Sequence, residues 1–436
     1  MNSIWTETAE RPQFEKLEHD VKTDVLIIGG GITGILCAYI LKRAGVDCIL
    51  AEADSICSGI TRNTTAKITC QHGLIYSETA RRFGYETARL YLEAQLAAMS
   101  EYRRLCTAIA CDYEELPSYV YSLDDRRKIE REVETLNRIG VPAKFTKNIH
   151  LPFSVAGAVR IDKQAQFNPL KLAFGIAKEL SIYENTKIIE LRPDGAITDR
   201  GKIASERIIV ATHFPFLNKH GSYFLKMYQH RSYVLALKNA PNVNGMYVDE
   251  NETGMSFRNY NGLLFVGGGS HRTGKSGGNW NVLEEFYKKN YPDAKPVCRW
   301  ATQDCMTLDG IPYIGQYSRR TENMYVATGC NKWGMTSAMV AAMLLTDLMK
   351  GKATPYASVF SPSRSILRPQ LAINTVEALG GLLRPTAPRC PHMGCALKYN
   401  KQEHSWDCSC HGSRFSENGS LIDNPATDGK KAMPSP

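Results

Sequence analysis

Residues 23 to 54, TDVLIIGGGITGILCAYILKRAGVDCILAEAD, constrain the fold of this chain more than any other segment. The short apolar run at 25–28 is typical of a buried parallel strand, and residues 32–43 have the spacing of a helix. Residues 47–51 are again short and apolar, which predicts a second strand. The segment therefore predicts a β-α-β unit, the start of an α/β domain with a parallel sheet.

Three glycines in G-x-G-x-x-G spacing connect the first strand to the helix. Gly29 permits a tight turn, Gly31 lets the backbone approach a pyrophosphate, and Gly34 allows the helix to pack closely on the strand. Glu52 ends the second strand, at about the distance where an acidic group meets a ribose hydroxyl. Because strand, glycines, helix and acid occur in the required order, they predict a dinucleotide site.

The composition sets the broad class of the protein. A chain of 436 residues is long enough for two or more domains, and 43% hydrophobic with 22% charged residues is typical of a globular protein. The net charge is +9, but Lys and Arg are dispersed, so we expect no nucleic-acid site. No apolar run is long enough for a membrane span, and the polar residues 1–20 contain no signal-peptide core, which favours the cytoplasm.

Four of the 13 cysteines and three of the 10 histidines lie in residues 389–415, RCPHMGCALKYNKQEHSWDCSCHGSRF. Cys390-x-His392 and Cys408-x-x-His411 offer two thiolates and two imidazoles, the ligands of zinc or of an iron-sulfur centre. Structural zinc usually begins with a Cys-x-x-Cys type of knuckle, whereas this pairing is the pattern in which two histidines replace two cysteines on one iron. The spacing therefore favours a [2Fe-2S] centre over zinc.

The remaining segments continue the α/β pattern with one interruption. Residues 168–180 have helical period, and 186–191 and 207–216 are strand-like. Residues 217–304 are aromatic and rich in strand-forming residues, which predicts a separate and mostly antiparallel layer. The α/β pattern then returns, with a helix expected at 336–350.

Over about residues 20–360 the chain resembles FAD-dependent oxidoreductases of the D-amino-acid oxidase and glycine oxidase superfamily. GITRNTTAKITCQHG at 59–73 is similar to the Thr-rich flavin-contacting segment of these enzymes, and TLDGIPYIG with YVATGCNKWGMTSAM is similar to their closing flavin signature. The resemblance implies that the chain binds FAD, with a helix N-terminus aimed at the flavin pyrimidine edge, where its partial positive charge suits an anionic reduced flavin. The implied FAD-binding residues are Gly29, Gly31, Ile32, Thr33, Gly34, Glu52, Thr61, Thr65, Lys67, Gly329, Gly334, Met335 and Thr336.

A second nucleotide site, for NAD, is not expected. The best second glycine motif, LLFVGGGSHRTG, has Arg272 where the third glycine should fall, so its glycines predict a turn or bulge in a sheet. We expect noncovalent FAD because no residue is clearly placed for attachment to the ring, although Cys330 lies beside the closing signature's first glycine.

The resemblance also implies oxidation of a small amine or amino acid at a carbon bonded to nitrogen, without a necessary protein base. The candidate substrate residues are Tyr233, Arg258 and Asp304, each of which could equally have a structural role. Many amino-acid-oxidising relatives carry an arginine shortly before the DG-x-P motif, and Asp304 lies near that place here. We therefore expect a cationic amine in preference to a simple amino acid.

The segments CPHMGC and CSCHGS resemble Rieske proteins. The resemblance implies Cys390, His392, Cys408 and His411 as ligands of a [2Fe-2S] cluster, and a disulfide between Cys395 and Cys410. Ser413 matches a hydroxyl that bonds cluster sulfur in respiratory Rieske proteins, and Phe415 stands where those often have Tyr. Few residues precede the first ligand pair, so we expect a trimmed all-β module that depends on packing against the flavin domain.

We thus expect an α/β Rossmann-like flavin-binding domain, an α+β antiparallel-sheet substrate domain and a small Rieske-like module. The expected boundaries are an N-terminal arm at 1–20, a discontinuous FAD-binding domain at 21–75, 150–216 and 305–360, a substrate domain at 76–149 and 217–304, a linker at 361–385 and the Rieske module at 386–436.

The expected function is FAD-dependent oxidation of a small amine or amino-acid-like substrate, with electrons passing through the cluster to an external acceptor, a protein or a quinone. The alternative is a non-catalytic flavin and iron-sulfur electron carrier fed by a partner reductase. A Rieske oxygenase is disfavoured because no separate mononuclear iron domain follows the cluster. A zinc-stabilised flavoprotein would lack the cluster's visible bands and its reduced-state EPR signal.

Overall fold

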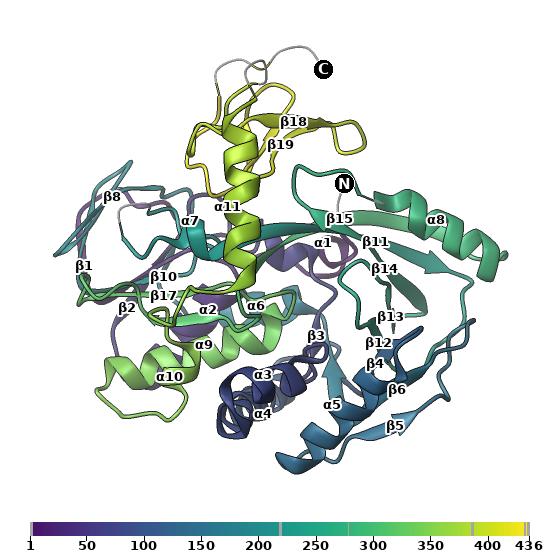
Figure 1. Ribbon diagram of the computed structural model, residues 1–436. Helices are drawn as coiled ribbons and strands as arrows, with labels where there is room; N and C mark the ends of the chain where they lie inside the picture. Colours follow the sequence, from purple (N-terminus) through teal and green to yellow (C-terminus); the bar gives the residue numbers. More distant parts are fainter. Residues whose placement is uncertain (1–2, 218–219, 278, 385–387, 431–432, 434–436) are drawn as a thin grey trace.

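The structure is a computed structural model that describes residues 3–217, 220–277, 279–384, 388–430 and 433. Within these residues the strands form three sheets, of eight, nine and four strands. Figure 1 shows the eight-stranded sheet on the left, the nine-stranded sheet on the right, and the four-stranded sheet above both. The expected architecture of a flavin-binding part, a substrate part and a small all-β module is confirmed.

The eight-stranded sheet is built on parallel strands around β1 (Val21–Ile28), which lies between β10 (Lys202–Val210) and β2 (Cys48–Ala51). The glycine turn leads from β1 into α2 (Ile32–Arg43), which packs against α9 (Gly334–Met349). The predicted β-α-β unit is therefore present, with the helix at the predicted residues. The other strands of this sheet are β7 (Ile182–Tyr183), β8 (Ile188–Arg192), β9 (Gly195–Thr198), β16 (Tyr313–Gln316) and β17 (Met324–Thr328).

Strand β1 is apolar without alternation because both of its faces are covered. Val25 and Ile27 belong to the large core that includes α2 and α9, whereas Leu26 and Ile28 pack into a second core with Phe214 on the opposite side of the sheet. The sheet is therefore covered on both faces at β1, and its parallel strands end at one edge, where a ligand site forms.

The nine-stranded sheet is mostly antiparallel, as the aromatic segment predicts. Its strands are β15 (Lys295–Thr307), β11 (Met227–Lys238), β14 (Leu263–Arg272), β13 (Ser256–Tyr260), β12 (Met246–Asp249), β4 (Glu114–Ser122), β6 (Gly157–Gln166), β3 (Lys67–Ile68) and β5 (Lys144–Thr146). Strand β6 lies in a range expected in the FAD-binding domain, yet it pairs antiparallel with β4 along nearly its whole length. The substrate sheet therefore continues past the expected boundary at residue 149, because β6 finds its hydrogen-bond partner in β4.

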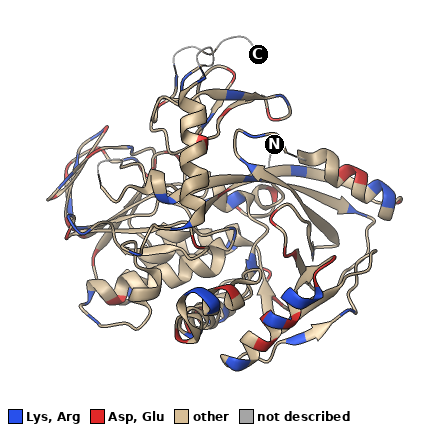
Figure 2. Ribbon diagram, in the orientation of Figure 1, with Lys and Arg blue, Asp and Glu red and all other residues tan. Residues whose placement is uncertain are grey.

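Helices cover the outside of both large sheets. The long helix α4 (Tyr85–Ala108) packs against α9, and α8 (Asn279–Asn290) covers β14. The other helices are α1 (Trp5–Thr8), α3 (Ile75–Phe83), α5 (Arg126–Arg138), α6 (Pro169–Ala177), α7 (Tyr223–Lys226) and α10 (Ala357–Phe360). Figure 2 shows both basic and acidic residues along α5 and α8. In the described part of the chain, no helix has the length and apolarity needed to cross a membrane.

The C-terminal module consists of an antiparallel sheet and the helix α11 (Pro369–Leu382) that leads into it. Its strands are β18 (Leu397–Asn400), β19 (Ser405–Cys408), β20 (Arg414–Ser416) and β21 (Leu421–Asp423). The segment expected as a linker is thus largely a helix. The end of this helix lies against the module, because a Cβ on Gly381 would lie 2.7 Å from the Sγ of Cys410. The expected boundary at 385 and 386 lies outside the described residues.

Candidate functional site

A cavity of about 1240 Å³ lies where the three parts of the molecule meet. Its wall includes the glycine turn, strands β11, β14 and β15 of the substrate sheet, and the segment that opens α9. Six residues of the C-terminal module complete the wall: Leu421, Ile422, Asp423, Asn424, Ala426 and Thr427. The expected flavin site and the expected metal module therefore share one cavity.

Most of the residues predicted to bind FAD line this cavity: Gly29, Gly31, Ile32, Thr33, Glu52, Thr61, Thr65, Lys67, Gly334 and Met335. Gly34, Gly329 and Thr336 are not among its lining residues. A Cβ on Gly34 would lie 1.9 Å from the carbonyl oxygen of Gly29, and one on Gly329 would lie 2.3 Å from the side chain of Thr307. These two glycines are needed for packing, and Thr336 is buried within α9.

The glycine turn has the geometry that a dinucleotide pyrophosphate needs. A Cβ placed on Gly31 would approach only the hydroxyl of Thr61, at 3.4 Å, so its backbone faces open space. The carboxylate of Glu52 accepts hydrogen bonds from the N–H groups of Gly30 (2.5 Å) and Asp54 (2.9 Å), which hold it at the end of β2. The residues at this end of the cavity therefore fit FAD.

Of the three candidate substrate residues, Tyr233 and Asp304 line the cavity and Arg258 does not. Arg258 is fully buried, and its guanidinium donates to the carbonyl oxygens of Thr65 (2.5 Å) and Ala66 (2.7 Å). Burial lowers the pKa of Arg258 to about 9. Its position indicates that Arg258 braces the loop before β3, and it does not face a substrate.

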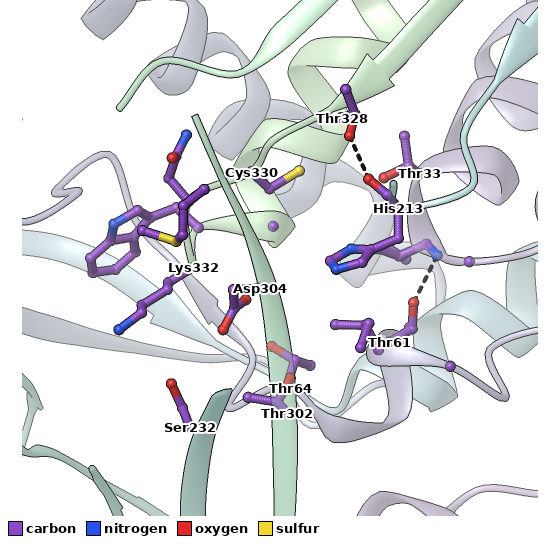
Figure 3. A pocket seen from close by; sticks show the side chains of 18 of the residues that line it. Thr33, Thr61, Thr64, His213, Ser232, Thr302, Asp304, Thr328, Cys330 and Lys332 are labelled. Carbon is purple, nitrogen blue, oxygen red and sulfur yellow. Dashed lines mark hydrogen bonds between the residues drawn. The ribbon is translucent and has the colours of Figure 1, made fainter. Parts of the chain in front are cut away.

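Asp304 has a cationic neighbour that the sequence did not single out. Burial raises the pKa of the Asp304 carboxyl to about 6, against the opposing charges of Lys332 and Arg231. The ammonium of Lys332 lies 3.2 Å from the carbonyl oxygen of Glu252 and 3.4 Å from the hydroxyl of Ser270. Figure 3 shows Asp304 and Lys332 on one side of the cavity and His213 on the other. One end of the cavity thus presents both a carboxyl group and an ammonium group.

The predicted metal ligands form two pairs. The thiols of Cys390 and Cys408 share a hydrogen bond, which together with the hydroxyl of Ser413 lowers the pKa of Cys390 to about 7. The imidazoles of His392 and His411 lie with their centroids 5.0 Å apart at an angle of 85°. The Nδ1 atom of His411 is buried and has no hydrogen-bond partner among the described residues. A buried ligand atom without a partner is what an absent metal would leave.

The pairing fits a two-iron cluster better than one zinc ion. Among the described residues, only one group of three or more His, Cys, Asp or Glu side chains has all its ligand atoms within 4.8 Å of one another, and it consists of Cys395, Cys408 and Cys410. The four predicted ligands do not form such a group. A single tetrahedral ion needs its four ligands closer together than the two predicted pairs lie. Cys395 and Cys410 form the expected disulfide, with their Cα atoms 6.6 Å apart.

The substrate sheet holds the second ligand loop through its backbone. Arg272 donates to the carbonyl oxygens of residues 409 and 410, at 3.0 and 3.1 Å. The amides of Gln229 and Gln303 donate to the carbonyl oxygens of residues 411 and 412, at 2.8 and 2.9 Å. Four consecutive carbonyls of the module are therefore bonded by side chains of β11, β14 and β15, which explains how so short a module can be fixed in place.

A buried group of charges also joins the module to β11. Glu403 accepts hydrogen bonds from Arg231 (3.0 Å), from the hydroxyl of Tyr233 (3.0 Å) and from Arg414 (2.9 Å). Arg414 also pairs with Asp423 at 3.0 Å. The candidate Tyr233 is thus oriented by the C-terminal module. No local pattern predicts the contacts of Glu403 with Arg231 and Tyr233, because these partners are separated from it by more than 150 residues.

Comparisons with known proteins agree with this geometry. Residues 24–348 match the family described as FAD dependent oxidoreductase, and residues 358–434 match the Rieske [2Fe-2S] domain. The chain is 34% identical to YhfW of Bacillus subtilis (strain 168), which is named as a Rieske 2Fe-2S iron-sulfur protein, over 97% of this chain and 96% of that protein. It is 24% identical to gamma-glutamylputrescine oxidoreductase of Escherichia coli (strain K12), over 78% of this chain and 86% of that protein.

Among solved structures, glycine oxidase from Geobacillus kaustophilus has the same fold, with a TM-score of 0.67 at 21% identity over 79% of this chain and 99% of that one. The two family matches give the cofactors as FAD and a [2Fe-2S] cluster. Since the first match covers most of the chain and the likeness to YhfW covers nearly all of it, the chain belongs to the family of FAD-dependent oxidoreductases and carries a C-terminal Rieske domain.

Proposed function

We propose that this enzyme oxidises a small amine or amino-acid-like substrate at a carbon bonded to nitrogen and passes the electrons through its Rieske cluster to an external one-electron acceptor. Oxidation of such an amine to the imine releases two electrons and two protons. Bound FAD supplies two-electron oxidation and the cluster supplies one-electron transfer, so two single transfers follow each substrate molecule. The observation that carries this proposal is the shared cavity, whose wall includes the glycine turn, Asp304 and the Rieske module.

In this proposal the glycine turn would hold the diphosphate and Glu52 the ribose. Cys390 and Cys408 would bind one iron of the cluster, and His392 and His411 the other. Support comes from the open backbone at the turn, the paired thiols and the unpartnered Nδ1 of His411.

We assign the substrate to the end of the cavity that holds Asp304 and Lys332. The Asp304 carboxylate can pair with an ammonium group or take its proton, which leaves the neutral amine that oxidation requires. Lys332 can pair with a carboxylate. Two of the similar proteins, gamma-glutamylputrescine oxidoreductase and glycine oxidase, are named for an amine and an amino acid, which supports this class.

The test is an anaerobic screen of amines and amino acids for bleaching of the bound flavin, followed by kinetics of two variants. Asp304→Asn should lower kcat/KM by about 10- to 150-fold, which corresponds to the loss of a charged hydrogen bond worth about 1.5 to 3 kcal/mol. For a substrate with a carboxylate, Lys332→Met should cause a similar loss. For an amine without a carboxylate, Lys332→Met should have little effect on kcat/KM. As a control, Thr302→Ser, on the same strand as Asp304, should leave kcat/KM unchanged for both kinds of substrate.

The pH profile gives a second readout. Because the pKa of Asp304 is raised to about 6, kcat/KM for a cationic amine should fall as the pH drops below that value and protonates the carboxyl. Asp304→Asn should lose this limb of the profile. If no amine or amino acid bleaches the flavin while a reductase partner reduces it, the protein is instead an electron carrier.

A further inference from the structure

A short segment after β10 runs from the cavity wall to the histidines of the metal centre. It begins at the glycine turn, where the N–H of Ala211 donates to the carbonyl oxygen of Ile28 at 2.8 Å. A Cβ on Gly29 would lie 2.8 Å from the carbonyl oxygen of Ala211, so the two backbones are in close contact. Residues 211 to 213 all line the cavity. This end of the segment therefore faces the space assigned to FAD.

The other end of the segment is Phe214, which is fully buried. Its ring meets the imidazoles of His392 and His411 edge-on, with centroids 6.5 Å away in both cases. One phenyl ring thus contacts both histidines proposed to bind the same iron. Phe214 directly follows His213, which lines the cavity.

The Rieske module and the flavin-binding part both hold this segment. The side-chain amide of Asn424, in the module, donates to the carbonyl oxygens of Thr212 (2.5 Å) and Phe214 (3.1 Å). From the other side, the hydroxyl of Thr328 donates to the carbonyl oxygen of His213 (Figure 3). Three successive carbonyls are therefore fixed, and the distance between cavity and cluster cannot vary freely.

His213 has the backbone conformation of a constrained residue. Its φ of +63° lies in the left-handed region that few non-glycine residues occupy, and such a conformation persists where the surroundings impose it. Burial lowers the pKa of its imidazole to about 4, so the ring is neutral at neutral pH. The segment is thus rigid and uncharged, and it needs little rearrangement when a charge passes.

From these contacts we propose that residues 211–214 are the electron-transfer connection between the flavin cavity and the cluster, with Phe214 positioning both imidazole ligands at its end. The connection presupposes the proposed transfer from FAD to the cluster. Each event moves one electron, which oxidises the flavin by one equivalent and reduces one iron of the cluster from Fe³⁺ to Fe²⁺. The second electron follows after an external one-electron acceptor has reoxidised the cluster.

The test uses the holoenzyme and needs no substrate. A laser flash with 5-deazariboflavin reduces the bound FAD, and absorbance then follows its first-order reoxidation as the cluster is reduced. Phe214→Leu should slow this phase by about tenfold or more, since small displacements of reacting partners have effects of that size. Asn424→Asp keeps the shape but cannot donate to the two carbonyls, and it should slow the phase as well.

Phe224→Leu is the matched control. Its ring contacts His411 at 6.2 Å but lies outside residues 211–214, so the rate should stay within about twofold, the range of a substitution outside the connection. The reduced-cluster EPR spectrum and midpoint potential are recorded for every variant, and an unchanged spectrum shows that the cluster itself is intact. Equal rates in Phe214→Leu and wild type, or equal losses in Phe214→Leu and Phe224→Leu, would overturn the connection. A wild-type enzyme with no such phase would instead overturn the proposed function.

Discussion

Removing the charge of Glu403 should weaken the attachment of the Rieske module to the substrate sheet. The side chain of Glu403 is only 7% exposed, and it accepts hydrogen bonds from Arg231, Tyr233 and Arg414. The two guanidinium groups lower its pKa from 4.5 to about 2. At about 1.4 kcal/mol per pKa unit, the ionised carboxylate contributes about 3 kcal/mol to the free energy of unfolding.

Glu403→Gln should therefore lower the denaturant midpoint for loss of the cluster's circular dichroism at pH 7 by the equivalent of about 3 kcal/mol. A carboxyl with a lowered pKa stabilises the fold above its usual pKa, so the difference from wild type should shrink as the pH falls from 4.5 towards 2. The control is Glu417→Gln, an exposed carboxylate of the same module, which should leave the midpoint unchanged. A Glu403→Gln protein as stable as wild type at pH 7 would refute the reasoning.

Three further predictions concern the cofactors. Gly31→Val should abolish FAD binding while the protein still folds, because a Cβ at this position approaches only Thr61. Gly34→Val should unfold the domain, because its Cβ would collide with the carbonyl oxygen of Gly29. Flavin fluorescence and thermal melting distinguish the two outcomes. Ser413→Ala should lower the cluster potential by about 40 to 90 mV, the loss of a hydrogen bond worth about 1 to 2 kcal/mol, and Phe415→Tyr should raise it; film voltammetry measures both. Acid precipitation should release all the flavin, because burial raises the pKa of Cys330 to about 12 and keeps it an unreactive thiol.

The features that the sequence predicts well are those whose geometry is local. The glycine spacing requires a turn between strand and helix, and the helix begins and ends where its periodicity predicts, at Ile32 and Arg43. The two ligand motifs, Cys390-x-His392 and Cys408-x-x-His411, are similarly local, because each motif is contained in a single short loop. A site formed by residues close together in the chain can therefore be predicted from the sequence.

The features that it predicts poorly depend on contacts between distant segments. The sequence makes Arg258 a candidate because it places a cationic side chain on a strand of the substrate sheet. Side chains of a strand alternate between its two faces, however, and this one points towards the carbonyl oxygens of Thr65 and Ala66. Glu403 and Phe214 carry no motif at all. Their roles arise only when the module docks on β11 and on the end of β10, which local propensity does not determine.

The most direct test of this account is an anaerobic titration with the amine or amino acid that bleaches the flavin, read by optical and EPR spectroscopy on the same samples. The account predicts that the flavin bleaches and that a Rieske-type EPR signal grows with it, and that adding a one-electron acceptor such as ferricyanide restores both oxidised states. Bleaching of the flavin without any EPR signal, in protein whose cluster dithionite can reduce, would contradict the transfer of electrons from FAD to the cluster.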